Sequence, residues 1–150
     1  MAIKDLGHPA FACFDLEATL NFYETLGIQE SFRLLHDDGS LMLIYLHVGE
    51  DRFIEVFPNG PFPEERGKQS FMHICLSVDG IHDFVDEIRA QGIAIDTEPK
   101  MGLDHNIQAW ITDPDGNKIE LMEYSPKSPQ IAIRDGSAFP ASNILIKKEN

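Results

Sequence analysis

The chain has 150 residues, of which 43% are hydrophobic, enough for one globular domain with a core. It carries 12 Lys and Arg against 25 Asp and Glu, a net charge of −13, which argues against binding to nucleic acid or to an anionic membrane. No apolar run approaches the roughly 20 residues of a membrane helix, and no signal-peptide pattern is present, so we expect a cytoplasmic protein with a small-molecule partner.

The first half of the chain predicts one strand, one helix and three further strands. Gly7–Phe14 is small and apolar, as in a buried strand. Asp15 can cap a helix that ends at Gly27. Three runs rich in aromatic and aliphatic residues then predict strands at Glu30–His36, Leu41–Val48 and Arg52–Pro58. A polar linker with two prolines, Asn59–Ser70, follows.

The second half repeats this order. The pattern predicts a strand at Phe71–Val78 and a helix that ends at Gly92, followed by strands at Ile93–Thr97, Ile107–Thr112 and Lys118–Tyr124. Because Gly27 and Gly92 lie 65 residues apart, we interpret the chain as a duplicated unit. We predict an α+β fold of paired βαβββ modules, 5–59 and 70–125, whose sheets form a half-open barrel. Residues 126–150 are expected to be an irregular extension, in which Ile144–Ile146 could add a short strand.

The two cysteines, Cys13 and Cys75, lie in apolar segments far apart in the sequence. A disulfide framework needs more cysteines than this, and small apolar neighbours are typical of a buried thiol. We therefore predict that both cysteines are reduced and buried.

Each repeat places a histidine in its first strand and a glutamate in its last. His8 precedes Glu55 by 47 residues, and His73 precedes Glu120 by the same number. A carboxylate inside an apolar strand costs several kcal/mol to bury unless a partner compensates it. Strand alternation is interpreted as turning the nearest cations in sequence, Arg52 and Lys118, away from these glutamates.

A divalent metal ion would compensate both glutamates. Two imidazoles and two carboxylates form a neutral set with one divalent cation, and such mixed ligands suit Ni, Zn, Co, Mn or Fe better than Ca or Mg. The alternative is that His8 and His73 are ordinary core histidines, while Glu55 and Glu120 face solvent. The matching offset alone is weak support, but the cost of a carboxylate in an apolar strand occurs at equivalent positions in both repeats, so the metal interpretation is favoured for the four residues together.

Two motifs resemble the vicinal oxygen chelate superfamily, which includes glyoxalases, bleomycin-resistance proteins and dioxygenases. The segment 21–27, NFYETLG, is similar to its first-helix motif, and the segment 113–121, DPDGNKIEL, is similar to its D-P-D-G-N-x-I-E-L ending. The resemblance covers about residues 5–125, and it implies paired βαβββ modules around a metal. In this superfamily the set His8, Glu55, His73 and Glu120 matches bacterial-type glyoxalase I, the lactoylglutathione lyase.

This resemblance implies a metal-dependent lyase or isomerase in which the metal holds adjacent substrate oxygens. Glu120 is then implied as the carboxylate base that transfers a proton, with Glu55 across the site from it. Glyoxalase I forms each centre across a dimer, so we expect a homodimer, although a site within one chain is also open. Other superfamily activities remain open as well: ligand sequestration without metal, an epimerase reaction, or extradiol dioxygenase chemistry.

The sequence departs from glyoxalase I at one informative position. That enzyme carries an arginine four residues after its first ligand, where it holds a glutathione carboxylate, and this chain has Ala12 there. By alternation Asn106, Gln108 and Trp110 share one strand face, which we interpret as the substrate pocket for a neutral, hydroxyl-bearing or aromatic group. Core packing is the alternative for Trp110, and His105 is expected in a surface loop.

Overall fold

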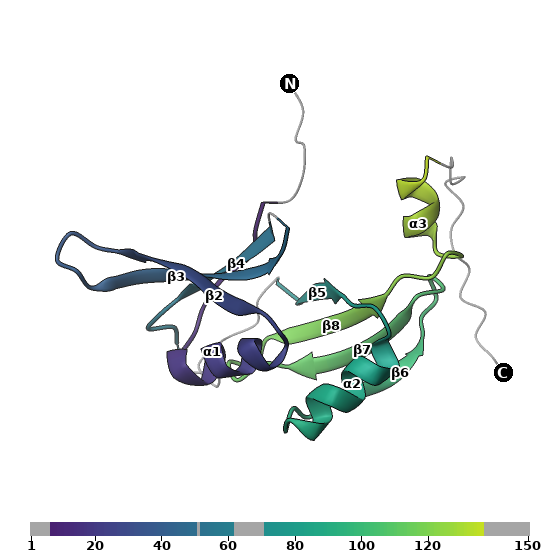
Figure 1. Ribbon diagram of the computed structural model, residues 1–150, viewed down its shortest axis with the longest axis horizontal. Coiled ribbons are helices and arrows are strands. Elements are labelled where there is room, and N and C mark those ends of the chain that lie inside the picture. Colours follow the sequence, from purple (N-terminus) through teal and green to yellow (C-terminus); the bar gives the residue numbers. More distant parts are fainter. Residues whose placement is uncertain (1–6, 51, 62–70, 137–150) are drawn as a thin grey trace. The chain divides into compact units, whose positions relative to one another are not determined.

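The computed structural model describes residues 7–50, 52–61 and 71–136 (Figure 1). The first half contains β1 (Ala10–Ala12), α1 (Leu16–Thr25), β2 (Gln29–Leu35), β3 (Leu41–Gly49) and β4 (Arg52–Phe57). The second half contains β5 (His73–Ser77), α2 (Ile81–Ala90), β6 (Thr97–Met101), β7 (Ile107–Thr112), β8 (Lys118–Glu123) and α3 (Pro129–Arg134). The order βαβββ therefore occurs twice, and the predicted α+β fold of paired modules is confirmed.

Each module forms its own four-stranded mixed sheet. The strand orders are β1-β4-β3-β2 and β5-β8-β7-β6, and the first strand of each module pairs in parallel with the last. Ala10 lies opposite Glu55 in one sheet, and Cys75 lies opposite Glu120 in the other. Residues that lie 65 positions apart in the sequence therefore occupy the same place in the strand pairing of the two sheets.

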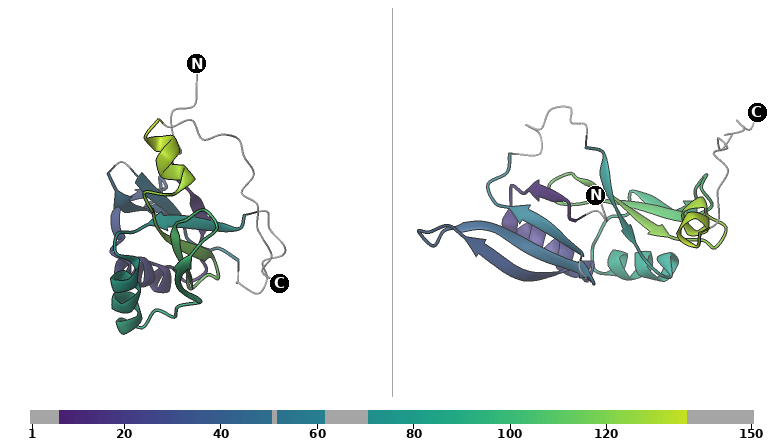
Figure 2. Two further views of the ribbon diagram at one scale, coloured as in Figure 1. Left: turned by 90° about the vertical axis from the view of Figure 1, so that its right-hand side faces the viewer. Right: turned by 90° about the horizontal axis from the view of Figure 1, so that it is seen from above.

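Each sheet has one covered face and one more open face. In β4 the buried Ile54 and Val56 alternate with the partly exposed Phe53 and Glu55. In the second sheet α2 packs on β6, β7 and β8 through a buried apolar stripe (Figure 2). The covered faces of the two sheets and their helices contain buried aliphatic side chains at Ile44, Leu46, Ile54, Val56, Ile81, Val85, Ile88, Ala109, Ile111, Ile119 and Leu121.

One predicted strand lies later in the chain than expected. The sequence predicts a strand at residues 93–97, whereas β6 spans Thr97–Met101. The backbone N–H of Ile93 still donates to the carbonyl of Ile88, so this residue completes the turn after α2. Pro99 makes the later segment a poor strand candidate, but β6 is an edge strand, where a missing N–H is tolerated.

Part of the expected irregular extension is a helix. Ser128 is buried, and its hydroxyl oxygen accepts a hydrogen bond from the backbone N–H of Ile131, which caps α3. The expectation of an irregular segment is therefore wrong for Pro129–Arg134. The possible strand at Ile144–Ile146 lies outside the described residues.

The chain divides into two compact units. The first comprises residues up to Met72 together with Asp113–Asn117, and the second comprises His73–Thr112 with the chain from Lys118 onward. None of the described helices is long and apolar enough to cross a membrane.

The turn Asp113–Asn117 belongs to the first unit because buried hydrogen bonds join it to α1. The Asp115 carboxylate accepts from the backbone N–H of Phe14 (2.6 Å) and from the hydroxyl of Thr19 (2.8 Å). Asp113 accepts from the phenol of Tyr23 at 3.2 Å. Burial raises the pKa of Asp113, although hydrogen bonds from Asn117 and Tyr23 oppose that effect. The aspartates of the D-P-D-G-N motif thus have a structural role here.

Candidate metal centre

The first sheet brings His8 and Glu55 together. His8 precedes Ala10 by two residues, so its side chain shares the face of Glu55, which lies opposite Ala10. The His8 Nε2 atom is 3.3 Å from a carboxylate oxygen of Glu55. The Glu55 side chain is 12% exposed and that of His8 is 43% exposed. The carboxylate is thus nearly buried, while the imidazole remains accessible from one side.

The second sheet repeats this arrangement with His73 and Glu120. The His73 Nε2 atom is 3.3 Å from a carboxylate oxygen of Glu120, and the side chains are 37% and 9% exposed. Trp110 lies opposite Glu120 on β7, and its ring meets the His73 imidazole edge to face at 4.9 Å. Both predicted pairs therefore form with the same distance and the same gradient of exposure.

The two glutamates have different neighbours. Tyr45 lies opposite Glu55, and its phenol donates a hydrogen bond to that carboxylate, which raises the pKa of Tyr45. Cys75 lies opposite Glu120. Although the residue is exposed, desolvation of the thiol by the surrounding protein, together with the charge of Glu120 and a hydrogen bond to it, raises the pKa of Cys75 to about 12. The thiol is thus protonated at neutral pH and donates to the carboxylate.

Both cysteines are free, as predicted, and Cys13 is buried. The expectation of burial is wrong for Cys75, which is exposed. Its strand lies at the edge of the second sheet, and its side chain shares the open face with Glu120. An edge position with an open face explains why an apolar neighbourhood in the sequence did not lead to burial.

The interpretation that Lys118 faces away from Glu120 is wrong. Lys118 and Glu120 are two positions apart in β8, so strand alternation places both on one face. The Lys118 ammonium group instead donates to Asp96 at 2.9 Å and to Thr112 at 2.7 Å. Glu120 pairs with His73, whereas Lys118 binds Asp96 and Thr112.

The geometry of each pair fits two neighbouring ligands of one metal ion. Ligands bonded at about 2.1 Å and at right angles are about 3.0 Å apart, close to the 3.3 Å observed. Imidazole nitrogen and carboxylate oxygen together suit first-row transition metals and zinc. Within the described residues of one chain, no group of three or more His, Cys, Asp or Glu side chains is placed to hold a metal ion. Each unit therefore holds one His–Glu pair.

The predicted substrate residues have different environments. Gln108 and Trp110 are partly exposed, and both lie on the face of the second sheet that carries Glu120. Asn106 is fully buried, and its amide is used within the fold. It donates to Asp104 (2.8 Å) and Gln130 (3.1 Å), and its oxygen accepts from the backbone N–H of Ser125. Asn106 thereby anchors α3 to the second sheet.

Sequence reasoning missed the aromatic neighbour of the first pair. Tyr45 lies 65 residues before Trp110, so the repeat itself could have identified it. Phe32 stacks on Tyr45 with ring centroids 4.3 Å apart, and Phe32 is 45% exposed. The open face of the first sheet is thus aromatic. His105 is exposed in the turn before β7, as expected.

Comparisons with known proteins agree with this fold. The profile of the Glyoxalase/Bleomycin resistance protein/Dioxygenase superfamily matches residues 5–121. A probable lactoylglutathione lyase of Synechocystis sp. is 31% identical over 125 residues, covering 80% of this chain and 95% of that protein. Metallothiol transferase FosB of Staphylococcus epidermidis is 25% identical over 126 residues, covering 81% and 82%. A crystal structure of a bleomycin-binding protein complexed with bleomycin has a TM-score of 0.62 and 25% identity, covering 81% of this chain and all of that chain.

Proposed function

Because the chain belongs to the Glyoxalase/Bleomycin resistance protein/Dioxygenase superfamily, we propose that it is a divalent-metal-dependent lyase or isomerase of the glyoxalase I type. The observation that carries this proposal is the repeated His–Glu pair, at 3.3 Å in both sheets. Relatives with lactoylglutathione lyase names support the same reaction class.

In this proposal His8, Glu55, His73 and Glu120 hold one cation. We propose a homodimer in which the first pair of one protomer meets the second pair of its partner. The bound metal would supply Lewis-acid stabilisation of negative charge on substrate oxygens. The cation could be Ni, Zn, Co, Mn or Fe, because the donor set accommodates each of them.

In this proposal, side chains of the protein transfer the proton, orient a metal ligand and bind the substrate. Glu120 takes a proton from the carbon next to a carbonyl group and returns it to the neighbouring carbon, which is general acid–base catalysis. Its 9% exposure excludes most bulk water from the proton it holds. Trp110 orients His73 by its ring contact. The Gln108 amide nitrogen donates to Asp104 at 3.3 Å, which leaves its oxygen and its second N–H to meet polar groups of the substrate. Asn106 is left out of this role because its amide is already used.

The test begins with metal content. Purified protein should bind one divalent cation per protomer by elemental analysis, and each paired variant, His8→Ala with Glu55→Gln or His73→Ala with Glu120→Gln, should lose it. With the hemithioacetal of methylglyoxal and glutathione, Glu120→Gln should lower turnover by about 10²–10⁴-fold. Normal turnover of Glu120→Gln with metal still bound would refute the assignment of the base.

A second candidate function is sequestration of an aromatic ligand without chemistry. The stacked pair of Phe32 and Tyr45 offers a flat apolar surface on an open sheet face. The similar bleomycin-binding protein was crystallised in complex with bleomycin. A metal-free protein that binds bleomycin tightly and turns over no hemithioacetal would favour this function over the first.

A further inference from the structure

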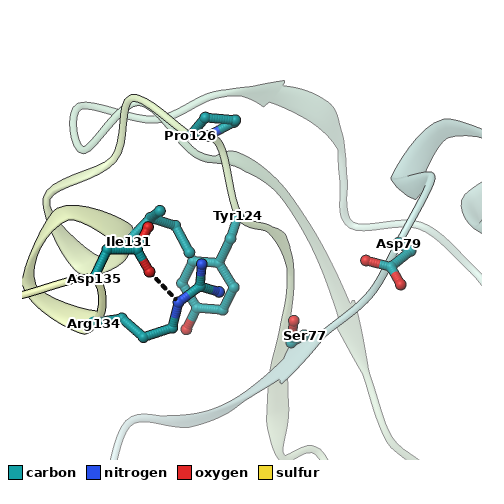
Figure 3. A pocket seen from close by; sticks show the side chains of 7 residues that line it. All are labelled: Ser77, Asp79, Tyr124, Pro126, Ile131, Arg134 and Asp135. Atoms are coloured by element: carbon teal, nitrogen blue, oxygen red, sulfur yellow. Dashed lines mark hydrogen bonds and ion pairs between the residues drawn. The ribbon is translucent and has the colours of Figure 1, made fainter.

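The second unit contains a pocket at the end of the open sheet face. Its volume is about 380 Å³, within the roughly 300–1,000 Å³ typical of small-molecule sites. Its walls come from the end of β5, the segment after β8 and the helix α3 (Figure 3). Five of these residues lie outside the part of the chain that the superfamily profile matches: Tyr124, Pro126, Ile131, Arg134 and Asp135. Most of the pocket is thus formed by residues after the matched part.

One wall of this pocket carries Arg134 together with Asp135, and the other wall carries a second carboxylate, Asp79. Figure 3 shows Arg134, Asp135 and Tyr124 on one side, and Ser77 and Asp79 on the other. The Nε atom of Arg134 donates to Asp135 at 2.9 Å. This ion pair steadies the guanidinium through Nε alone, and the fork of terminal amino groups has the geometry that binds a carboxylate.

The charge of the chain restricts the ligand. With a net charge of −13, the protein repels a simple anion. A simple cation would offer no acceptor to the terminal amino groups of Arg134, because the ion pair with Asp135 uses only Nε. A zwitterion avoids both costs, because its carboxylate meets Arg134 while its ammonium group meets Asp79. The apolar side chains of Pro126 and Ile131 then offer contacts to a short aliphatic side chain.

We propose that this pocket binds the α-ammonium carboxylate group of an amino acid, free or as the end of a larger substrate, between Arg134 and Asp79. The amide network that holds α3 is essential to this site. Gln130 of α3 donates to Asp104 at 2.7 Å and accepts from Asn106, and this positions Arg134 one turn further along the helix. Asn106 would thereby act on the pocket through α3 rather than by touching the ligand.

The pocket also continues the face of the candidate metal centre. Ser77 and Tyr124 each lie four residues beyond His73 and Glu120 on that face, about 13 Å along an extended strand. A substrate with an amino-acid end could therefore reach from one site to the other. This last consequence rests on the proposed function, whereas binding to the pocket does not.

The experiment uses three ligands that differ only in charge. L-Methionine carries both groups, N-acetyl-L-methionine only the carboxylate, and L-methioninamide only the ammonium group. Titration of the full chain, stripped of metal, is followed by chemical shifts or calorimetry. We expect L-methionine to bind at least tenfold more tightly than either analogue, with an affinity in the millimolar range because the pocket is open.

Two variants then assign each charge. Arg134→Gln should weaken L-methionine about tenfold but leave L-methioninamide unchanged, and Asp79→Asn should weaken L-methionine but leave N-acetyl-L-methionine unchanged. Arg89→Gln and Asp37→Asn are matched controls, since both residues are exposed and lie outside the pocket. Equal binding of all three ligands, no saturable binding of L-methionine, or equal effects of the controls would overturn the proposal. None of these readouts depends on metal or turnover, so their failure is distinct from failure of the proposed function.

Discussion

The strongest test of the shared centre is complementation between two inactive chains. One variant carries His8→Ala with Glu55→Gln and loses the whole first pair. The other carries His73→Ala with Glu120→Gln and loses the whole second pair. Both histidines are about two-fifths exposed and both glutamates become isosteric amides, so we expect both variants to fold.

The expected result follows from counting pairs. In a homodimer of either variant, every shared site retains only two of four donors. In a heterodimer, one site combines both altered pairs and the other combines both intact pairs, because a twofold interface is reciprocal. A heterodimer isolated with two different tags should therefore bind about half the metal of the wild type and recover about half its turnover.

The readout is metal per protomer by elemental analysis, measured beside a wild-type dimer that carries the same two tags. That control should retain its full metal content. A heterodimer with no more metal than the two homodimers would refute a site shared between protomers, and so would a wild-type protein that is monomeric and binds one metal.

Three further predictions concern single residues. Gly60→Ala should lower the free energy of unfolding, measured in urea, by about 1–3 kcal/mol, because the added Cβ atom would lie 2.7 Å from the backbone of β1 at Ala12. Gly7→Ala is the control and should change this free energy little, since no atom lies within 4 Å of the added Cβ. Burial raises the pKa of Asp113 above its ordinary 3.8, so the native state holds this proton to higher pH than the unfolded state does. The free energy of unfolding should therefore fall as pH rises from about 4 to that raised pKa. In urea unfolding at a series of pH values, Asp113→Asn should make the free energy of unfolding less dependent on pH in this range. Tyr45→Phe removes the phenol that donates to Glu55 and should weaken metal affinity about tenfold in calorimetric titration, with unchanged affinity counting against this contact.

The duplicated fold could be predicted because its signals are periodic. Alternating apolar residues and helix-ending glycines at one offset identify strands and helices without any tertiary information. Pro99 shows where this fails, because a proline in a strand is acceptable only at a sheet edge, and edge position is a property of the whole sheet. The helix α3 was missed for a related reason, since its cap, Ser128, is recognisable only once the residue is seen to be buried.

Some features of the candidate site could also be predicted from the sequence, and others could not. The pairs of His8 with Glu55 and His73 with Glu120 could be predicted because a buried carboxylate is anomalous in an apolar strand. Asn106 could not be separated from Gln108 by alternation, since both have amide side chains on one predicted face. Both amides donate to Asp104. What distinguishes Asn106 is its complete burial and its hydrogen bonds with Gln130 of α3 and with the backbone of Ser125.

The equivalent residues around the two glutamates argue for a division of roles that the ligand set alone does not reveal. At the position opposite each glutamate on the antiparallel strand, the first module has Tyr45 and the second has Trp110. Both rings contact the histidine of their own module edge to face, Tyr45 with His8 and Trp110 with His73, and the Tyr45 phenol also donates a hydrogen bond to Glu55. The donor to Glu120 is the thiol of Cys75, a weaker donor than a phenol. A carboxylate held less firmly moves at lower cost, which supports the proposal that Glu120 rather than Glu55 is the base.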